Sequence, residues 1–208
     1  MSKLRKIYNR LFREQSDTFM PPVINKAVCS LSKESYCGGS LADKNVLLVS
    51  NDMDIVPAFI SQYKTENCYL NVVPYTNELT MEGLQNAERE MIGHCDSIVN
   101  IIKGNADEDS VKQTYQWFQV ESPFLSAKNR QAAICTVLIL DKKEQVESLK
   151  PSFIHFISSI ATLINNHNIV VNAILAMPTA NMEEIAATSA FLSSKYGEAM
   201  TGETLNLG

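Results

Sequence analysis

The chain has 208 residues, 45% hydrophobic and 20% charged, which fits one globular domain with an appendage and excludes disorder or a fibrous repeat. Its formal net charge of -5 leaves no basic surplus for a nucleic acid, so we expect no nucleic-acid partner. No apolar run reaches the roughly 18 residues of a membrane span, and the amino terminus lacks the apolar core of a signal peptide. We therefore expect a cytoplasmic protein.

Cysteines and histidines give no sign of a disulfide framework or of a metal site. The five cysteines are odd in number and lack C-x-x-C spacing, and the three histidines lie far apart in the sequence. We interpret the cysteines as small buried hydrophobic residues with reduced thiols, and we expect no metal ion.

Residues 2–14 predict a basic amphipathic helix. One face carries Leu4, Ile7, Tyr8, Leu11 and Phe12, and lysines and arginines surround it. Such a helix can lie on an anionic membrane, dock on a partner, or pack on its own domain or dimer mate, and the sequence leaves these alternatives open. Residues 15–44 contain a Pro-Pro pair, a Gly-Gly pair and several serines, as connecting segments do. We therefore assign 1–44 to a helix and linker, and 45–208 to one domain.

From residue 45 onward, apolar β-rich runs alternate with segments of helical periodicity. We expect strands at 45–50, 68–73, 96–102, 132–140, 168–175 and 203–207, and helices near 54–64, 80–93, 108–130, 146–166 and 182–195. Parallel strands need crossover connections, and helices between the strands supply them. The alternation therefore predicts an α/β, Rossmann-like three-layer sandwich with a mostly parallel sheet.

The most specific pattern lies in the last 40 residues. The segment 168–174 reads N-I-V-V-N-A-I, and 183–208 contains E-E-I-A, then F-L-x-S, then T-G-x-x-L. This order of elements resembles the end of a short-chain dehydrogenase/reductase, close to the β-ketoacyl-carrier-protein reductase type. With D-S-I-V-N at 96–100 in place of that family's D-x-L-V-N-N-A-G, the resemblance covers residues 41–208.

The resemblance implies a catalytic tyrosine acid with a lysine four residues later, on one face of a helix. Counting back from the strand at 168 places Lys150 at the lysine position and Val146 at the tyrosine position. A valine cannot donate a proton, so we interpret Lys150 as a catalytic remnant on an ordinary helix surface. The family's serine has no counterpart, because Cys135 and Thr136 lie too early in their strand. Gln119 falls near the family's active-site asparagine.

The resemblance also implies a glycine-rich turn that binds the cofactor pyrophosphate. Residues 50–57 occupy that stretch and contain no glycine. Asp52 and Asp54 would place negative charge where a phosphate belongs; alternatively, one of them is a helix N-cap, with Pro57 in the first turn.

Two asparagines keep family positions at the cofactor site. Asn51 lies in the former glycine turn, and Asn100 matches the first asparagine of N-N-A-G. We assign both as the family's cofactor-binding positions, but we do not expect them to function, and we expect no cofactor.

Two segments are shorter than the family's pattern. Between the first strand and residue 96 there is room for only one strand, at 68–73, and we expect the second strand and its helix to be the missing βα unit. Residues 175–182 join the next strand almost directly to its helix, so the substrate lid is shortened.

These losses predict a degenerate, catalytically silent member, a pseudoenzyme that assembles as a homo-oligomer or with an active homologue of the family. Residues 150–164 are apolar nearly all round, and 108–130 carries aromatic side chains, as interface helices do. The alternative is an NAD(P)-dependent oxidoreductase with displaced catalytic groups, such as Lys150 with Tyr115. A third reading is a membrane-surface or scaffold role through residues 2–14.

Overall fold

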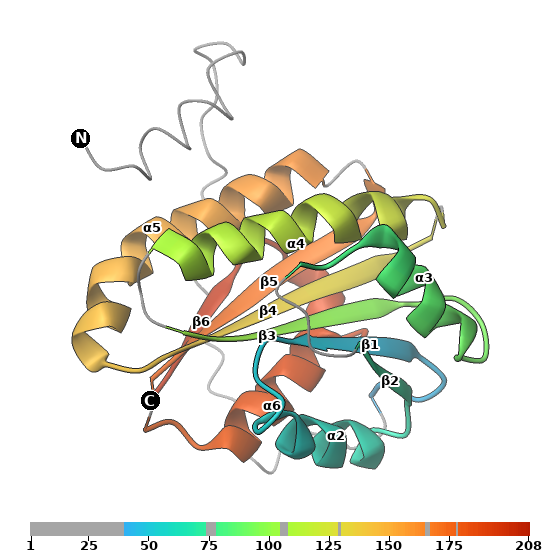
Figure 1. The fold of residues 1–208 in the computed structure, drawn as a ribbon, viewed down its shortest axis with the longest axis horizontal. Coiled ribbons are helices and arrows are strands. Elements are labelled where there is room, and N and C mark those ends of the chain that lie inside the picture. The colour runs from blue at the N-terminus through green and yellow to red at the C-terminus, as the bar shows by residue number, and fades with distance from the viewer. Residues whose placement is uncertain (1–39, 74–77, 105–107, 129, 165–166, 178) are drawn as a thin grey trace. The chain divides into compact units, whose positions relative to one another are not determined.

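The computed structural model describes residues 40–208 except 74–77, 105–107, 129, 165–166 and 178. Within these residues the chain forms a six-stranded parallel sheet, in the order β2-β1-β3-β4-β5-β6, between two layers of helices (Figure 1). The strands are β1 (Asn45–Ser50), β2 (Tyr69–Val73), β3 (Ser97–Gly104), β4 (Ala132–Leu140), β5 (Ile169–Ala176) and β6 (Thr204–Leu207). The helices are α2 (Val56–Thr65), α3 (Met81–Arg89), α4 (Glu108–Ser126), α5 (Lys143–Ile164) and α6 (Met182–Leu192), followed by the short η3 (Gly197–Ala199).

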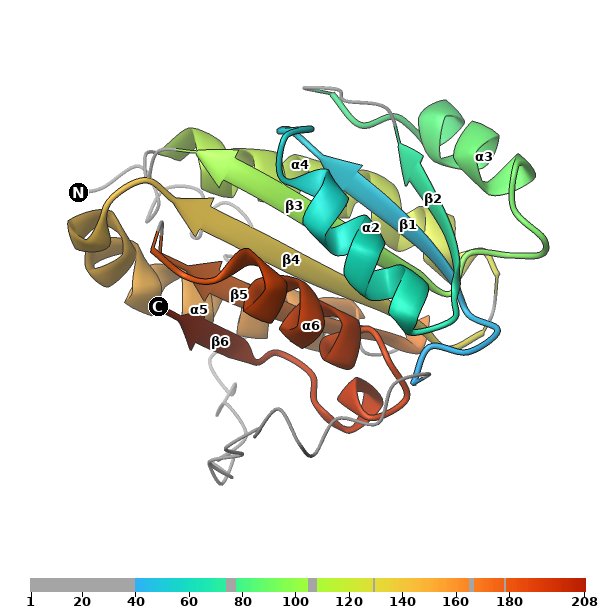
Figure 2. The ribbon, with the colours of Figure 1, turned by 90° about the horizontal axis from the view of Figure 1, so that it is seen from below.

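The predicted three-layer α/β sandwich is confirmed. Helices α3, α4 and α5 cover one face of the sheet, and α2 and α6 cover the other, where they lie side by side (Figures 1 and 2). Strands β1, β4 and β5 are buried along their whole length, so they read as continuous apolar runs rather than as alternating ones.

One expectation about the shortened region was wrong. Strand β2 pairs directly with β1, from Asn45 opposite Tyr69 to Val49 opposite Val73. In the doubly wound order 3-2-1-4-5-6, the place beside the first strand belongs to the second. The chain therefore keeps its second strand and lacks the third, outer one, because α3 crosses to the α4 and α5 face and leads straight into β3 (Figure 1).

The described chain begins with a buried connection to the end of α2. The carboxylate of Glu66 accepts hydrogen bonds from the backbone amide and the hydroxyl of Ser40, both at 3.1 Å. The predicted helix at 2–14 and the linker through residue 39 lie outside the described residues. Among the helices that are described, none is long and apolar enough to cross a membrane.

The signature residues near the end of the chain fasten β6 to β5. The Asn172 amide nitrogen donates to the Met200 carbonyl at 2.8 Å, and the Asn172 amide oxygen accepts from the Glu203 amide at 3.1 Å. Gly202 has φ of +79°, and a Cβ there would lie 3.3 Å from Ser158 Cα on α5. The V-N-A and T-G motifs therefore stabilise the sheet, which explains why they identify a fold.

Candidate functional site

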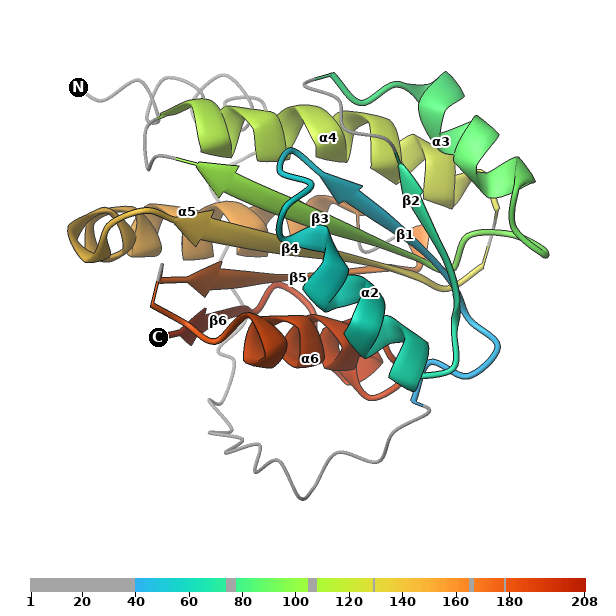
Figure 3. The ribbon, with the colours of Figure 1, turned by 60° about the horizontal axis from the view of Figure 1, so that its bottom comes forward.

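The carboxyl ends of β1 and β3 mark the place where a doubly wound sheet binds its ligand. These strands are neighbours in the sheet, yet β1 leads into α2 on one face and β3 leads toward α4 on the other (Figure 3). A crevice outside the strand ends at such a topological switch point is where this class of fold holds a nucleotide.

The Asn51 side chain joins the two strand ends at this point. Its amide nitrogen donates to the Lys103 carbonyl at 3.0 Å, and its amide oxygen accepts from the Lys103 amide at 2.8 Å. The same nitrogen donates to Gln113 Oε1 on α4 at 3.1 Å, and the Asn51 backbone amide donates to Ile101 O at 3.2 Å. The side chain therefore continues the pairing of β1 with β3 beyond the end of β1.

An ion pair lies beside this bridge. Lys103 Nζ is 2.9 Å from Asp52 Oδ2, and Asp52 Oδ1 accepts the backbone amide of Asp54 at 2.9 Å. The hydrogen bond from Lys103 is the main cause that holds the pKa of Asp52 below its ordinary value, against a smaller desolvation effect. The carboxylate is therefore ionised at neutral pH and already has a cationic partner.

The start of α2 differs from the sequence expectation. The N-cap residue is Ile55, which makes no side-chain cap, so the expectation that Asp52 or Asp54 caps this helix was wrong. Asp52 instead turns the loop upon itself by accepting the amide of Asp54. Pro57 does lie in the first turn, as predicted.

The residues at this switch point do not fit the pyrophosphate of a nicotinamide dinucleotide in its usual place. That site needs glycines for close backbone approach and free amides at the helix start. Here the amides of Asn51, Asp52 and Asp54 already donate within the protein, Pro57 has none, and Asp52 is anionic. No step of a hydride transfer can be assigned through such a site.

The other predicted cofactor position lies in a different environment. Asn100 is in the middle of β3 and fully buried, and its amide nitrogen donates to Glu121 Oε2 on α4 at 2.9 Å. The structure thus does not bring Asn100 together with Asn51 at one surface. The assignment of both asparagines as cofactor-binding positions stays a prediction.

The family's catalytic positions fall on α5 and β4. Val146 is buried, whereas Lys150, one turn later, is half-buried and makes no hydrogen bond or ion pair within the described part of the chain. Cys135 and Thr136 are both buried inside β4, away from its carboxyl end. The catalytic role of Lys150 stays a prediction.

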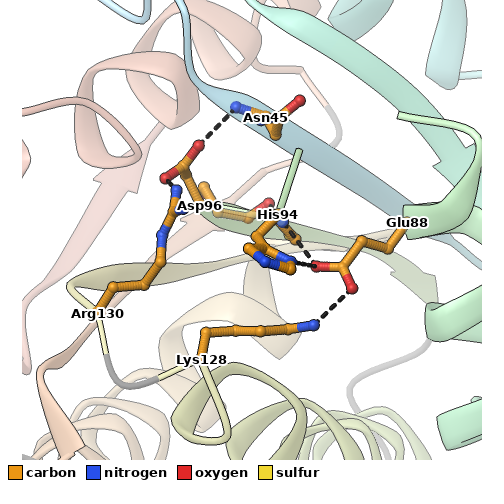
Figure 4. Close-up of polar contacts among 8 residues, drawn as sticks. Asn45, Glu88, His94, Asp96, Lys128 and Arg130 are labelled. Atoms are coloured by element: carbon orange, nitrogen blue, oxygen red, sulfur yellow. Dashed lines mark hydrogen bonds and ion pairs between the residues drawn. The ribbon is translucent and has the colours of Figure 1, made fainter. Parts of the chain in front are cut away.

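A second polar cluster, which sequence reasoning missed, lies at the opposite edge of the sheet (Figure 4). Asp96 accepts the Asn45 backbone amide at 2.8 Å and pairs with Arg130. Next to it, Glu88 accepts the Cys95 amide at 2.8 Å and pairs with Lys128. The available signal was Asp96 just before β3, with Lys128 and Arg130 just before β4.

This amino-edge cluster (Asn45, Glu88, Cys95, Asp96, Lys128 and Arg130) acts as a structural clamp. It ties the starts of β1 and β3 to α3 and to the end of α4, and its carboxylates are satisfied by protein groups. Desolvation raises the pKa of Glu88, but the hydrogen bonds from Lys128 and Cys95 outweigh it and lower the pKa overall. The described residues contain no group of side chains suited to a metal ion.

Comparison with known proteins bears on the fold alone. No protein-family model matches the chain, and no curated protein matches it in sequence. Among solved structures, a short-chain dehydrogenase from Leptospira borgpetersenii with bound NAD+ superposes with a TM-score of 0.63 at 14% identity, covering 80% of this chain and 92% of that one. A short-chain dehydrogenase from Mycobacterium smegmatis gives a TM-score of 0.61 at 15% identity, covering 82% and 94%.

The NADH-dependent enoyl-[acyl-carrier-protein] reductase of Aquifex aeolicus is similar to the same extent. It gives a TM-score of 0.60 at 19% identity, and the match covers 81% of this chain and 96% of that chain. The chain therefore has the fold of the short-chain dehydrogenases and reductases, as its closing motifs predicted.

Proposed function

We propose that this protein is a short-chain dehydrogenase-like pseudoenzyme, which assembles with itself or with an active homologue and transfers no hydride. The observation that carries the proposal is the closed switch point. The Asn51 side chain makes two hydrogen bonds to the Lys103 backbone and one to Gln113, where a pyrophosphate would need open backbone. Asp52 adds negative charge at the same place.

The assembly role is supported by the outer surface of α4 and α5. Ile154 and Leu163 on α5 are large apolar side chains that are 38% and 44% exposed. Tyr115 on α4 packs edge-on against Phe156 on α5, with ring centroids 6.5 Å apart. A second copy or a homologue with the same helices would remove this apolar surface from water.

Light scattering after size exclusion, together with NADH and NADPH fluorescence titration, tests both halves of the proposal. We expect an oligomer, alone or with an added reductase of the same fold, and no saturable binding of either nucleotide. Ile154→Lys should break the oligomer, whereas Ile92→Lys, at a 75% exposed position in the loop after α3, should not. A monomer that captures no reductase would contradict the assembly role.

A second candidate is an NAD(P)-dependent oxidoreductase with displaced catalytic groups. It is favoured by the solved structures of this fold from Leptospira borgpetersenii and Brucella ovis, which hold NAD. Lys150 and Tyr115 are then the residues to test, although the Tyr115 hydroxyl already accepts a hydrogen bond from Gln119 at 3.0 Å. Micromolar NADH binding that Lys150→Met weakens would establish this candidate over the first.

We place the protein in the cytoplasm and assign residues 2–14 to contact with a partner or an anionic membrane surface. The basic face of that segment supports the assignment. Sedimentation with anionic vesicles should carry down the full chain but not a chain that lacks residues 2–14. Equal sedimentation of the two would exclude the membrane contact.

A further inference from the structure

A buried polar cluster lies between α4 and the centre of the sheet, outside both edges described above. It contains Glu121 of α4, Asn100 of β3 and Thr136 of β4, each with no exposed surface. Asn100 and Thr136 are register partners on adjacent parallel strands, so their side chains leave the sheet on the same face. The amide nitrogen of Asn100 donates to Glu121 Oε2 at 2.9 Å.

The cluster has buried polar atoms that lack hydrogen-bond partners in the described part of the chain. Within the described residues, Glu121 Oε1 and Asn100 Oδ1 are both buried without a hydrogen-bond partner, as are Thr136 Oγ1 and Trp117 Nε1. Glu121 Oε1 and Asn100 Oδ1 belong to the carboxyl and amide groups that the 2.9 Å bond already joins. If Glu121 is ionised, these two atoms are acceptors only, and each buried acceptor left unmatched is costly.

Among the residues that the structure describes, no charged group compensates a carboxylate at this position. Helix α4 packs on β3, β4, β5 and α3, and its Tyr115 contacts Phe156 of α5. The described titratable groups of those elements and of α4 are either engaged elsewhere or partly exposed. Those of α5 are all partly or fully exposed, namely Lys143, Glu144, Glu147, Lys150 and His155. Lys103 pairs with Asp52, Glu88 pairs with Lys128, Cys135 packs in the core on the α2 and α6 face, β5 has no titratable residue, and Glu82, Arg89, Asp109, Lys112 and Tyr115 are not fully buried.

Burial is the main influence on this carboxyl group. Desolvation raises the pKa of Glu121 to about 8, although the hydrogen bond from Asn100 acts in the opposite direction. A buried carboxyl without a cation prefers its neutral form, because the ionised form would lose its hydration without gaining a partner.

We propose that Glu121 is a neutral carboxylic acid in the folded protein at neutral pH, and that its proton latches α4 to the sheet through Asn100. Glu121 Oε1–H donates to Asn100 Oδ1, while Asn100 Nδ2–H donates to Glu121 Oε2, and the two bonds close a ring. When pH rises, the proton passes to solvent water, the first bond is lost, and a bare carboxylate remains buried. The latch therefore holds in acid and neutral solution and opens in alkali.

The latch makes stability depend on pH in a defined direction. The pKa of Glu121 is raised from 4.5 to about 8, so between these values the folded chain binds one more proton here than the unfolded chain. Its stabilising contribution is complete below pH 4.5 and is lost as pH rises toward 8.

Urea unfolding between pH 5 and pH 9 tests the latch in wild type, Glu121→Gln and, as a control, Glu147→Gln at an exposed position on α5. Relative to Glu121→Gln, the folding equilibrium constant of the wild type should fall by up to about tenfold per pH unit until the acid has titrated. Glu147→Gln should follow the wild type. Parallel curves for wild type and Glu121→Gln would overturn the proposal.

A measurement on the wild type alone covers the case in which Glu121→Gln does not fold. Carbon-13 NMR of labelled glutamate carboxyl groups should show one group that titrates near pH 8, together with rising amide exchange in α4 beyond the intrinsic effect of pH. If every glutamate titrates below pH 6, Glu121 is ionised at neutral pH and the latch does not exist.

Discussion

The two edges of the sheet are held together by different chemistry. At the amino edge, Asp96 and Glu88 are nearly buried carboxylates, each with a backbone amide and a basic side chain as partners. At the carboxyl edge, the neutral amide of Asn51 makes the connection, and the ion pair of Asp52 with Lys103 lies at the surface.

The difference shows two ways in which the backbone groups at the strand ends can be hydrogen-bonded within the protein. In a doubly wound sheet the amino edge has no ligand to bind, so charged groups there can be committed to stability. The carboxyl edge is the ligand edge, and here a single side chain takes over backbone groups that a nucleotide site would leave accessible. A loop without glycine can thus be fixed at this edge by the hydrogen bonds of one side chain.

The largest expected effect is at the amino edge. Asp96→Ala removes the acceptor of the Asn45 amide and the partner of Arg130 at a site that is 7% exposed, and should lower the free energy of unfolding by about 3 kcal/mol. Asp141→Ala, at an exposed position after β4, is the matched control at the other edge and should change it by less than about 0.5 kcal/mol. If urea unfolding shows the same loss of free energy for Asp96→Ala and Asp141→Ala, the two edges do not differ as described.

Glu88→Gln should have an intermediate effect that depends on pH. The variant keeps an acceptor for the Cys95 amide but loses the charge opposite Lys128, which should cost about 1.5 kcal/mol at pH 7. The pKa of Glu88 is held below 4.5, so the advantage of the wild type is present above that pH and is lost as pH falls through the lowered value. Urea unfolding from pH 3 to pH 7 checks this, and a difference that stays constant in acid would refute it.

The smallest effect is expected from Asn51→Ala at the carboxyl edge. The side chain makes three hydrogen bonds that are exposed or only partly buried, so we expect a loss of about 1 kcal/mol. Gln85→Ala, at an exposed position on α3, is the control and should be neutral. Thermal unfolding measures both variants. If Asn51→Ala lowers stability as much as Asp96→Ala does, the carboxyl edge contributes as much stability as the amino edge, which contradicts the comparison.

The sequence was a good guide to the elements because their signals are local. All six strands were predicted within two residues, since a continuous apolar run such as 132–140 is shorter than a typical buried helix and is typical of a buried strand. The helix starts were less exact: α5 begins at Lys143 instead of near 146, and α2 begins without a side-chain cap. Capping rules failed at α2 because the Asp52 side chain is committed to Lys103 and to the Asp54 amide.

Contacts between segments far apart in the chain could not be predicted from the sequence. The identity of the missing strand depends on which neighbour β2 pairs with, and its apolar run carries no information about that. The partners of Asn51 come from residues 52 and 62 positions later, and the partner of Glu121, Asn100, lies on β3, 21 positions earlier, so neither role has a local pattern. What could be predicted was the loss of the glycine turn, because a missing residue type is visible in any alignment of motifs.

The link between Asn172 and the segment after η3 constrains how the chain matures on the ribosome. Asn172 is almost completely buried, and both of its partners, the Met200 carbonyl and the Glu203 amide, are translated about thirty residues later. Until that segment emerges from the exit tunnel, β5 exposes an unpaired edge and a polar side chain without its partners. During that interval β5 is an open edge strand, the kind of edge on which incomplete chains pair wrongly.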